Sequence, residues 1–232
     1  MKIVYSHLLN LLEQQPKLEE LSGLLFQLGH EHEIDGEVLD MEITPNRGDC
    51  LSLKGLARDL NYFYQAKELP KSDMALPALA LQFDNQAQEL CPNISFMEIE
   101  IETVPTKYES YLEAFFKDLG INKNNFFTDI SNYLAYESGQ PTHCFDQSTM
   151  QGHFSLAKKK LNTKFKTLLD TELELTDENL VFLLDDAVIS LAGTMGGAST
   201  ACSSNTTKVL VECAYFHPEE ILGKARKYNL SS

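Results

Sequence analysis

The polar segment at residues 129–146 contains side chains suited to chemistry near neutral pH. Asn132 can donate and accept hydrogen bonds, and His143 can act as an acid, a base or an oriented donor. A glycine and a proline shortly before His143 are expected to fix its backbone. A structural role for His143 is an equally good alternative, because a hydrogen bond to an aspartate such as Asp146 commonly holds a loop together.

Residues 190–199, SLAGTMGGAS, place three glycines among small residues directly after an expected strand. Such a segment allows the backbone to approach a ligand closely. It lacks the GKS or GKT ending of a phosphate loop, the GxGxxG spacing of a dinucleotide site and the GxSxG of a serine nucleophile elbow. A tight turn is the alternative, but separate glycine sites on both sides of Thr194 and Met195 favour a functional role.

Glu212 lies within the otherwise apolar run at residues 209–216. A carboxylate in a buried strand needs a hydrogen-bond donor, since otherwise its pKa shifts or its burial costs several kcal/mol. The donor is either another group of the protein or a hydroxyl group of a ligand.

A fourth segment, TPNRGDCLS at residues 44–52, is dense in turn-forming residues. Asp49 or Ser52 is suited to cap the helix that follows, and the planar guanidinium of Arg47 can hold loops or carboxylates. A rigid turn that leads into a helix is a more common role for such a segment than an active site. We therefore interpret Asn46, Arg47 and Asp49 as a structural motif.

The first part of the chain has the pattern of helices with one strand. Apolar residues repeat at helical spacing over residues 3–28, where Pro16 separates two short helices and Gly29 ends the second. Residues 38–43 alternate as a strand, and residues 52–65 have one apolar helical face. The polar, proline-containing stretch at residues 66–88 is expected to be a linker or an extended arm.

The second part changes in character after Cys91. Residues 96–102 alternate strictly, residues 108–119 form an amphipathic helix, and several short apolar strands follow. This order predicts an α+β fold. We expect a small N-terminal module of helices and strands in residues 1–85, followed by a mixed β-sheet domain with flanking helices in residues 86–232.

Composition restricts the class of protein. The formal net charge of −15 repels a phosphate backbone, so weak affinity for RNA is expected of the chain alone. The five cysteines form no CxxC pair, which indicates reduced thiols, a cytoplasmic location and neither a zinc site nor another cofactor. There is no run of eighteen apolar residues and no signal-peptide pattern, so we expect no membrane span.

Taken together and in this order, the four segments resemble motifs of the bacterial phenylalanyl-tRNA synthetase β subunit family. ITPNRGDCLSLKGLARDL at residues 43–60 resembles the TPNRxDCLS motif, and DISNYLAYESGQPTHCFD at residues 129–146 resembles DxTNY…GQPxHxFD. LAGTMGG at residues 191–197 resembles LAGxMGG, and VECAYFHPEEI at residues 211–221 resembles LExAxFxP. The resemblance covers nearly the whole chain.

This resemblance implies an editing domain, which hydrolyses tyrosine wrongly esterified to phenylalanine tRNA. His143 and Asn132 match the histidine and asparagine that would position a water or the terminal ribose beside the ester. Glu212 matches the glutamate that would accept a hydrogen bond from the tyrosine hydroxyl. The substrate-binding wall would consist of Ala192, Gly193 and Thr194. The implied partners are the 3′ end of mischarged tRNA and, in the full ligase, the synthetase α subunit.

The sequence also departs from the family pattern. Only residues 30–39 separate the first helices from the TPNR motif, where the family inserts an OB-fold that binds tRNA. The family continues beyond Ser232 with a threonine-containing segment and further domains, and it carries an arginine where this chain reads SLAK at residues 155–158. We therefore expect ester hydrolysis, and no aminoacylation by this chain alone.

Two other functions compete with this interpretation. The departures favour a non-catalytic module that binds an aromatic amino acid or serves subunit assembly. A freestanding trans-editing factor would need its own affinity for tRNA, for which the lysines at residues 158–160 with Lys164 and Lys166 are the candidates. A solvated lysine-rich loop is the more common interpretation of such a cluster.

Overall fold

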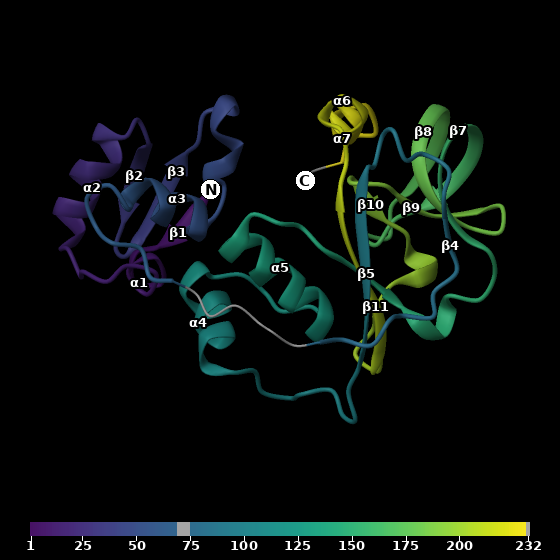
Figure 1. The fold of residues 1–232 in the computed structure, drawn as a ribbon, viewed down its shortest axis with the longest axis horizontal. Helices are drawn as coiled ribbons and strands as arrows, with labels where there is room; N and C mark the ends of the chain where they lie inside the picture. The colour runs from purple at the N-terminus through teal and green to yellow at the C-terminus, as the bar shows by residue number, and fades with distance from the viewer. Residues whose placement is uncertain (69–74, 231–232) are drawn as a thin grey trace. The chain divides into compact units, whose positions relative to one another are not determined.

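The chain folds into two compact units that are each assembled from separate segments. The computed structural model describes residues 1–68 and 75–230. The first unit comprises Met1–Leu76, Pro105–Asn124 and Asp129–Pro141. The second unit comprises Pro77–Val104, Asn125–Thr128 and Thr142–Ser232. Helices and several sheets occur together, which confirms the predicted α+β class (Figure 1).

The first unit contains a three-stranded antiparallel sheet in the order β1-β3-β2. Its strands are β1 (Lys2–Val4), β2 (Glu31–Asp35) and β3 (Val38–Glu42), the last of which was predicted. Gly36 adopts φ 61° at the first position of the two-residue turn between β2 and β3, where a glycine is favoured. β1 is too short to show alternation, and the buried residue of β2 is His32 instead of an apolar side chain, so neither strand was predicted.

Helices of the first unit pack with this sheet. They are α1 (Tyr5–Leu9), α2 (Leu18–Gln27), α3 (Leu53–Leu60) and α4 (Ser110–Leu119), and most of α5 (Phe126–Ser138) belongs to the same unit. The backbone N–H of Gly55 donates to Ser52 Oγ at 3.0 Å, which caps α3. Gly29 and Gly120 follow α2 and α4 with positive φ, as is typical of helix ends. α5 was not predicted, because polar residues such as Asp129, Ser131 and Asn132 interrupt its apolar positions.

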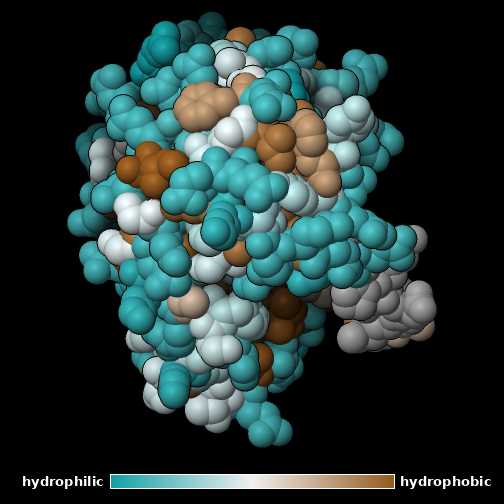
Figure 2. Space-filling model, turned by 90° about the vertical axis from the view of Figure 1, so that its left-hand side faces the viewer, coloured by the Kyte–Doolittle hydropathy of each residue, from teal (hydrophilic) through white to brown (hydrophobic). Residues whose placement is uncertain are grey.

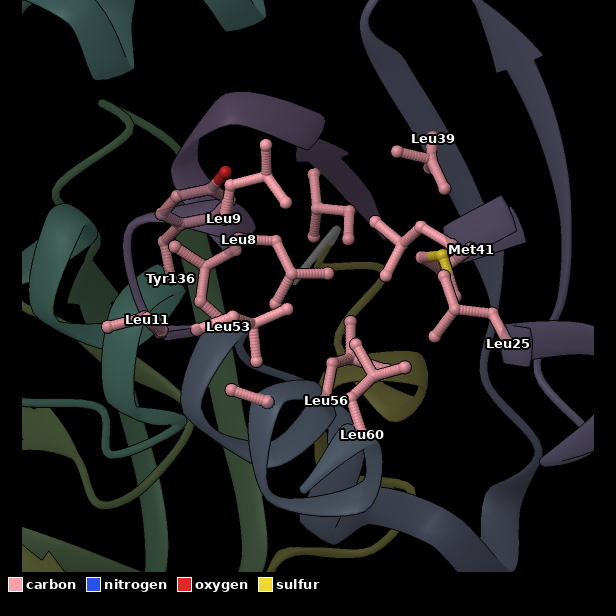
Figure 3. Packing of buried hydrophobic residues seen from close by; sticks show 14 of the residues in the cluster. Leu8, Leu9, Leu11, Leu25, Leu39, Met41, Leu53, Leu56, Leu60 and Tyr136 are labelled. Atoms are coloured by element: carbon pink, nitrogen blue, oxygen red, sulfur yellow. The ribbon is translucent and has the colours of Figure 1, made fainter. Parts of the chain in front are cut away.

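A leucine-rich core holds the first unit together (Figure 3). Leu8, Leu25 and Leu56 are completely buried in it, together with residues of β1 and β3. Phe115 of α4 and Tyr136 of α5 are buried in the same cluster. These aromatic side chains explain why residues 105–124 and 129–141 belong to the first unit, whereas the sequence had suggested a boundary near residue 85.

The TPNR segment forms the 3₁₀ helix η1 (Pro45–Cys50) beside α3. The Arg47 guanidinium donates to Asp49 Oδ1 at 3.1 Å, to Cys50 Sγ at 2.8 Å and to Asp59 Oδ2 at 2.5 Å. Burial, together with the carboxylate of Asp59, raises the pKa of the Cys50 thiol to about 12. Arg47 thus joins η1 to α3, while Asn46 is exposed.

The second unit contains two sheets, which were predicted only as scattered short strands. The five-stranded sheet has the order β10-β9-β8-β7-β4, and the three-stranded sheet has the order β5-β11-β6. The strands of the first are β4 (Phe83–Asn85), β7 (Phe154–Lys166), β8 (Glu172–Leu184), β9 (Ala187–Leu191) and β10 (Met195–Gly196). Those of the second are β5 (Asn93–Glu100), β6 (His143–Asp146) and β11 (Lys208–Tyr215).

Short helices and a phenylalanine-rich core complete the second unit. The helices are η2 (Gln147–Thr149), η3 (Ala198–Thr200), α6 (Pro218–Ile221) and α7 (Lys224–Lys227). Phe145 of β6, Phe154 of β7 and Phe182 of β8 are almost fully buried, and the rings of Phe154 and Phe182 stack with centroids 5.8 Å apart. This core holds the ends of β6, β9 and β11, which carry the candidate site.

Polar and charged side chains dominate much of the surface, as the composition requires. The described residues on the face drawn in Figure 2 are largely hydrophilic, and apolar areas are small and separate. Within the described residues, no helix has the length and apolar character needed to cross a membrane.

Replacing Leu56 by alanine tests the leucine core. Leu56 is completely buried, so we expect Leu56→Ala to lower the free energy of unfolding by about 2 to 5 kcal/mol. Leu51→Ala is the matched control, because that side chain is 48% exposed and its loss is expected to change stability by less than about 0.5 kcal/mol. Urea denaturation followed by circular dichroism measures both values. Equal unfolding midpoints for the two variants would contradict this description of the core.

Candidate functional site

Pairing between strands brings Glu212 and His143 together. β11 is the central strand of its sheet, and Glu212 lies opposite His143 of β6 on one side and Phe96 of β5 on the other. Directly paired residues of antiparallel strands project to the same face, with Cβ atoms about 4.5 to 5.5 Å apart. The three side chains therefore form a row across one face of the sheet. Leu210 and Phe145, the next pair on this face, belong to the phenylalanine-rich core.

The Glu212 side chain is largely buried, and its carboxyl group has no partner among the described residues. Only 8% of the residue is exposed, and the group makes no hydrogen bond or ion pair with any residue that the structure describes. Burial raises the pKa of Glu212 to about 7, because removal from water disfavours the charged form. Near neutral pH the group is therefore divided between a carboxylate, which only accepts hydrogen bonds, and a carboxylic acid, which can also donate one.

His143 also has an unsatisfied atom. Its Nε2 is buried and has no hydrogen-bond partner among the described residues. Burial lowers the pKa of His143 to about 4, so the ring is neutral at physiological pH. The ring meets the edge of Phe145 with centroids 4.5 Å apart, which fixes its orientation from one side.

Gly196 provides the space that the His143 ring occupies. A Cβ atom at Gly196 would lie 2.4 Å from His143 Cε1 and 3.0 Å from Nε2. The same Cβ would meet Leu168 Cδ1 at 2.7 Å. These distances are shorter than real contacts, so only glycine fits here while the ring keeps its place.

A tight turn at residues 191–194 forms the neighbouring wall. The backbone N–H of Thr194 donates to the carbonyl oxygen of Leu191 at 3.0 Å, and Gly193 adopts φ 64° at the third position of the turn. That position favours glycine in a type II turn. A Cβ at Gly193 would also lie 2.7 Å from Ile221 Cδ1, so the residue is required for packing too. Ala192 is buried in the phenylalanine-rich core beside this turn.

This arrangement is suited to a small ligand that carries a hydroxyl group. Two buried polar groups without partners are rare in folded proteins, because each costs about 1 to 3 kcal/mol. A ligand hydroxyl beside Glu212 would satisfy the carboxyl group, and a water or polar ligand atom beside His143 would satisfy Nε2. No described cysteine is activated here: burial, together with nearby Glu212, raises the pKa of Cys91 to about 11 and raises that of Cys213.

The second unit contains most of the predicted site residues. His143, Glu212, Ala192, Gly193 and Thr194 all belong to it. Asn132 is an exposed residue of α5 in the first unit, and its catalytic role remains a prediction from the sequence. Asp146, which the loop-holding alternative joined to His143, instead accepts hydrogen bonds from Ser148 and Thr206.

Two neighbours of the predicted residues were not identified from the sequence. In the sequence, Gly196 stands out only as one of three clustered glycines. Its position two residues after Thr194 could have indicated that it lies near the site. Phe96 was predicted to lie on a strand, but the register that places it beside Glu212 joins residues far apart in the chain.

Comparisons with known proteins find matches over most of the chain. The family described as the B3/4 domain matches residues 97–232, more than half of the chain. A phenylalanine–tRNA ligase β subunit of Psychrobacter arcticus is 31% identical over 211 residues, and one of Photorhabdus laumondii is 32% identical over 203 residues. Each alignment covers 85% of this chain, which spans about a quarter (25%) of the length of these curated relatives.

A solved structure is also similar to the chain. It is an N-terminal fragment of the phenylalanyl-tRNA synthetase β subunit from Pyrococcus horikoshii. The two chains share 15% sequence identity with a TM-score of 0.49, over 95% of this chain and 69% of the other.

Substitution of Gly196 tests the packing around His143. We expect Gly196→Ala to displace the His143 ring and to destabilise the protein by about 1 to 3 kcal/mol, because the new methyl group overlaps the ring. The His143 ring signals in a ¹H–¹³C NMR spectrum and the unfolding free energy report the two effects. Gly23→Ala is the control, since a Cβ at Gly23 meets no atom within 4 Å. An unmoved His143 signal in Gly196→Ala would contradict the described contact.

The pH dependence of stability tests the burial of Glu212. Because the pKa of Glu212 is raised from 4.5 to about 7 in the folded state, its protonated form stabilises the fold below about pH 4.5, and this contribution is lost as pH rises through 7. Glu212→Gln lacks the ionisation. We therefore expect the variant to match the wild type near pH 4.5 and to exceed it by up to about 3 kcal/mol at pH 8.

Urea denaturation across this pH range measures the difference. Glu100→Gln serves as the control, because Glu100 is largely exposed on the neighbouring strand β5. A constant difference between the wild type and Glu212→Gln from pH 4.5 to 8 would show that the carboxyl group is not buried.

Proposed function

Because this chain belongs to the B3/4 domain family, we propose that its second unit removes tyrosine that has been esterified to phenylalanine tRNA. The observation that carries the proposal is the pair of unsatisfied groups on one sheet face, the Glu212 carboxyl and His143 Nε2. The similarity to phenylalanine–tRNA ligase β subunits supports the choice of substrate.

Glu212 is proposed to select tyrosine over phenylalanine. The two amino acids differ by one hydroxyl group, which a hydrophobic pocket alone discriminates poorly. With tyrosine bound, the phenolic hydroxyl donates to the carboxylate or accepts from the carboxylic acid. With phenylalanine bound, the carboxyl group is left without a partner and out of contact with water, which costs about 1 to 3 kcal/mol. The site therefore favours the amino acid that the ligase has to reject.

Hydrolysis requires only a positioned water molecule. The water oxygen adds to the ester carbonyl carbon, the bond to the ribose oxygen breaks, and the proton of the water passes to that oxygen. The products are free tyrosine and tRNA with a free 3′ hydroxyl group. The neutral imidazole of His143 is suited to hold the water by a hydrogen bond, while the backbone of Gly193 lines the approach. An aminoacyl ester is already activated, so the step needs no serine or cysteine nucleophile.

The proposed partners follow from the same assignment. The substrate is the 3′ end of a mischarged tRNA, and within a complete phenylalanine–tRNA ligase the chain would act beside the α subunit in the cytoplasm. The net charge of −15 limits RNA affinity, so contact is proposed only with the end of the RNA.

Hydrolysis of tyrosyl- and phenylalanyl-tRNA by the whole chain tests the proposal. We expect the wild type to release tyrosine faster than phenylalanine. Glu212→Ala is expected to reduce that preference about 10- to 100-fold, because the hydroxyl group loses its partner. His143→Ala is expected to slow release of both amino acids. Glu100→Ala, which removes an exposed carboxylate from the neighbouring strand, is the charge-matched control and is expected to change neither rate.

Two outcomes would contradict different parts of this proposal. Unchanged discrimination by Glu212→Ala would remove Glu212 from the role of hydroxyl reader. Tyrosine binding in calorimetry without any ester hydrolysis would indicate a non-catalytic module that binds an aromatic amino acid.

A further inference from the structure

A groove beside the turn at residues 191–194 lies outside the row of Phe96, Glu212 and His143. It has a volume of about 900 Å³, near the upper limit for small-molecule sites. Its wall joins the tip of this turn to the α6–α7 region of the second unit. The residues that characterise it are Gly193, Thr194, Ile221, Leu222, Arg226 and Leu230.

The chemistry of the groove is that of a cation beside apolar surface. Leu222 is 84% exposed and so offers apolar surface in the wall of the groove. Arg226 is exposed, and its guanidinium makes no hydrogen bond or ion pair with a described residue. The two neighbouring lysines, in contrast, have partners. Lys224 donates to the carbonyl oxygen of Glu178, and Lys227 pairs with Asp177 at 3.0 Å.

The groove and the candidate site share one structural element. Ala192 is buried in the core that Phe145 and Leu210 of the site face complete, whereas Gly193 and Thr194 at the tip line the groove. Ile221 contributes to both, because it lines the groove and packs on Gly193. The turn whose Ala192 is buried in this core therefore also forms one wall of the groove.

We propose that the groove binds the last nucleotides of the RNA 3′ end, with the Arg226 guanidinium paired to a backbone phosphate and Leu222 packed against a base or ribose. This inference rests on the proposed function, since it concerns the part of an aminoacyl-tRNA that lies beyond the ester. A guanidinium forms bidentate hydrogen bonds with phosphate oxygens, and apolar side chains support unstacked nucleotides. Although the net charge of the chain is −15, Arg226 gives the groove a local positive charge without a partner among the described residues, which suits a polyanion.

The test uses RNA probes that cannot be hydrolysed. One probe is a fluorescent oligonucleotide ending in CCA, whose terminal adenosine carries tyrosine through a 3′ amide. The other is the 3′-tyrosylamido adenosine without any phosphate. Fluorescence anisotropy measures binding of the first to the whole chain, and displacement of the first measures binding of the second. Because no ester is cleaved, loss of hydrolytic activity and loss of this RNA contact are measured separately.

We expect Arg226→Ala to weaken binding of the oligonucleotide about tenfold and to leave binding of the tyrosylamido adenosine unchanged. The slope of log K against log salt concentration should decrease by about 0.7, the value for one phosphate contact on a single strand. Arg226→Lys, which keeps the charge, should recover part of the affinity. Lys107→Ala is the control, because it removes an equal charge from an exposed position outside the groove.

Four results would overturn the proposal. Equal losses for Arg226→Ala and Lys107→Ala would indicate general electrostatic attraction. Unaltered binding of the oligonucleotide by Arg226→Ala, or no binding by the wild type, would remove the phosphate contact. Displacement of the oligonucleotide by a polyglutamate peptide at similar concentration would indicate that the groove takes acidic chains without regard to nucleotides.

Discussion

The candidate site depends on the pairing of β11 with two strands at once. β5 and β6 come from parts of the sequence about fifty residues apart, and β11 follows later still, yet the antiparallel register sets Phe96, Glu212 and His143 in one row. A slip of one residue would turn all side chains of β11 to the other face. Glu212 would then leave the phenylalanine-rich core and Val211 would enter it. The apolar residues on the same face of β11 as Glu212 therefore hold its carboxyl group in a buried position, which is unfavourable for a carboxyl group by itself.

The unsatisfied groups of Glu212 and His143 distinguish this part of the core from an ordinary protein interior. Two other buried atoms of the second unit, Gln147 Oε1 and Thr200 Oγ1, also lack a partner among the described residues, whereas Asn179 accepts a hydrogen bond from the Tyr228 hydroxyl at 2.9 Å. Glu212 and His143 instead have pKa values displaced in opposite directions by the same cause, burial without compensation. Stability is reduced at this position, which is a common property of sites that a ligand completes. In the first unit the opposite holds, since Arg47 satisfies the acidic groups around η1.

Sequence patterns predicted the parts of this protein that depend on local order. The helices on both sides of Pro16, the strand at Val38 and the α+β class are confirmed by the structure, because leucine spacing and alternation report burial directly. Such patterns predicted neither helix α5 nor the assignment of α4 to the first unit. Both depend on packing of Phe115 and Tyr136 against leucines that are far away in the sequence. The chemical types at the site, a histidine, a glutamate and glycines, were evident in the sequence. Their contacts, such as Gly196 with His143, arise from strand register and turn geometry, which a single sequence does not encode locally.

The turn at Gly36 places Asp35 and Val38 directly opposite each other at the end of the β2–β3 hairpin. Chain ends that lie so close can accept a folded domain between them without any movement of the strands, and exposed turns tolerate such insertions best. The hairpin turn is thus a position at which a folded module can be inserted while the leucine core stays intact. The same property makes it a practical position for attaching a reporter domain to this protein.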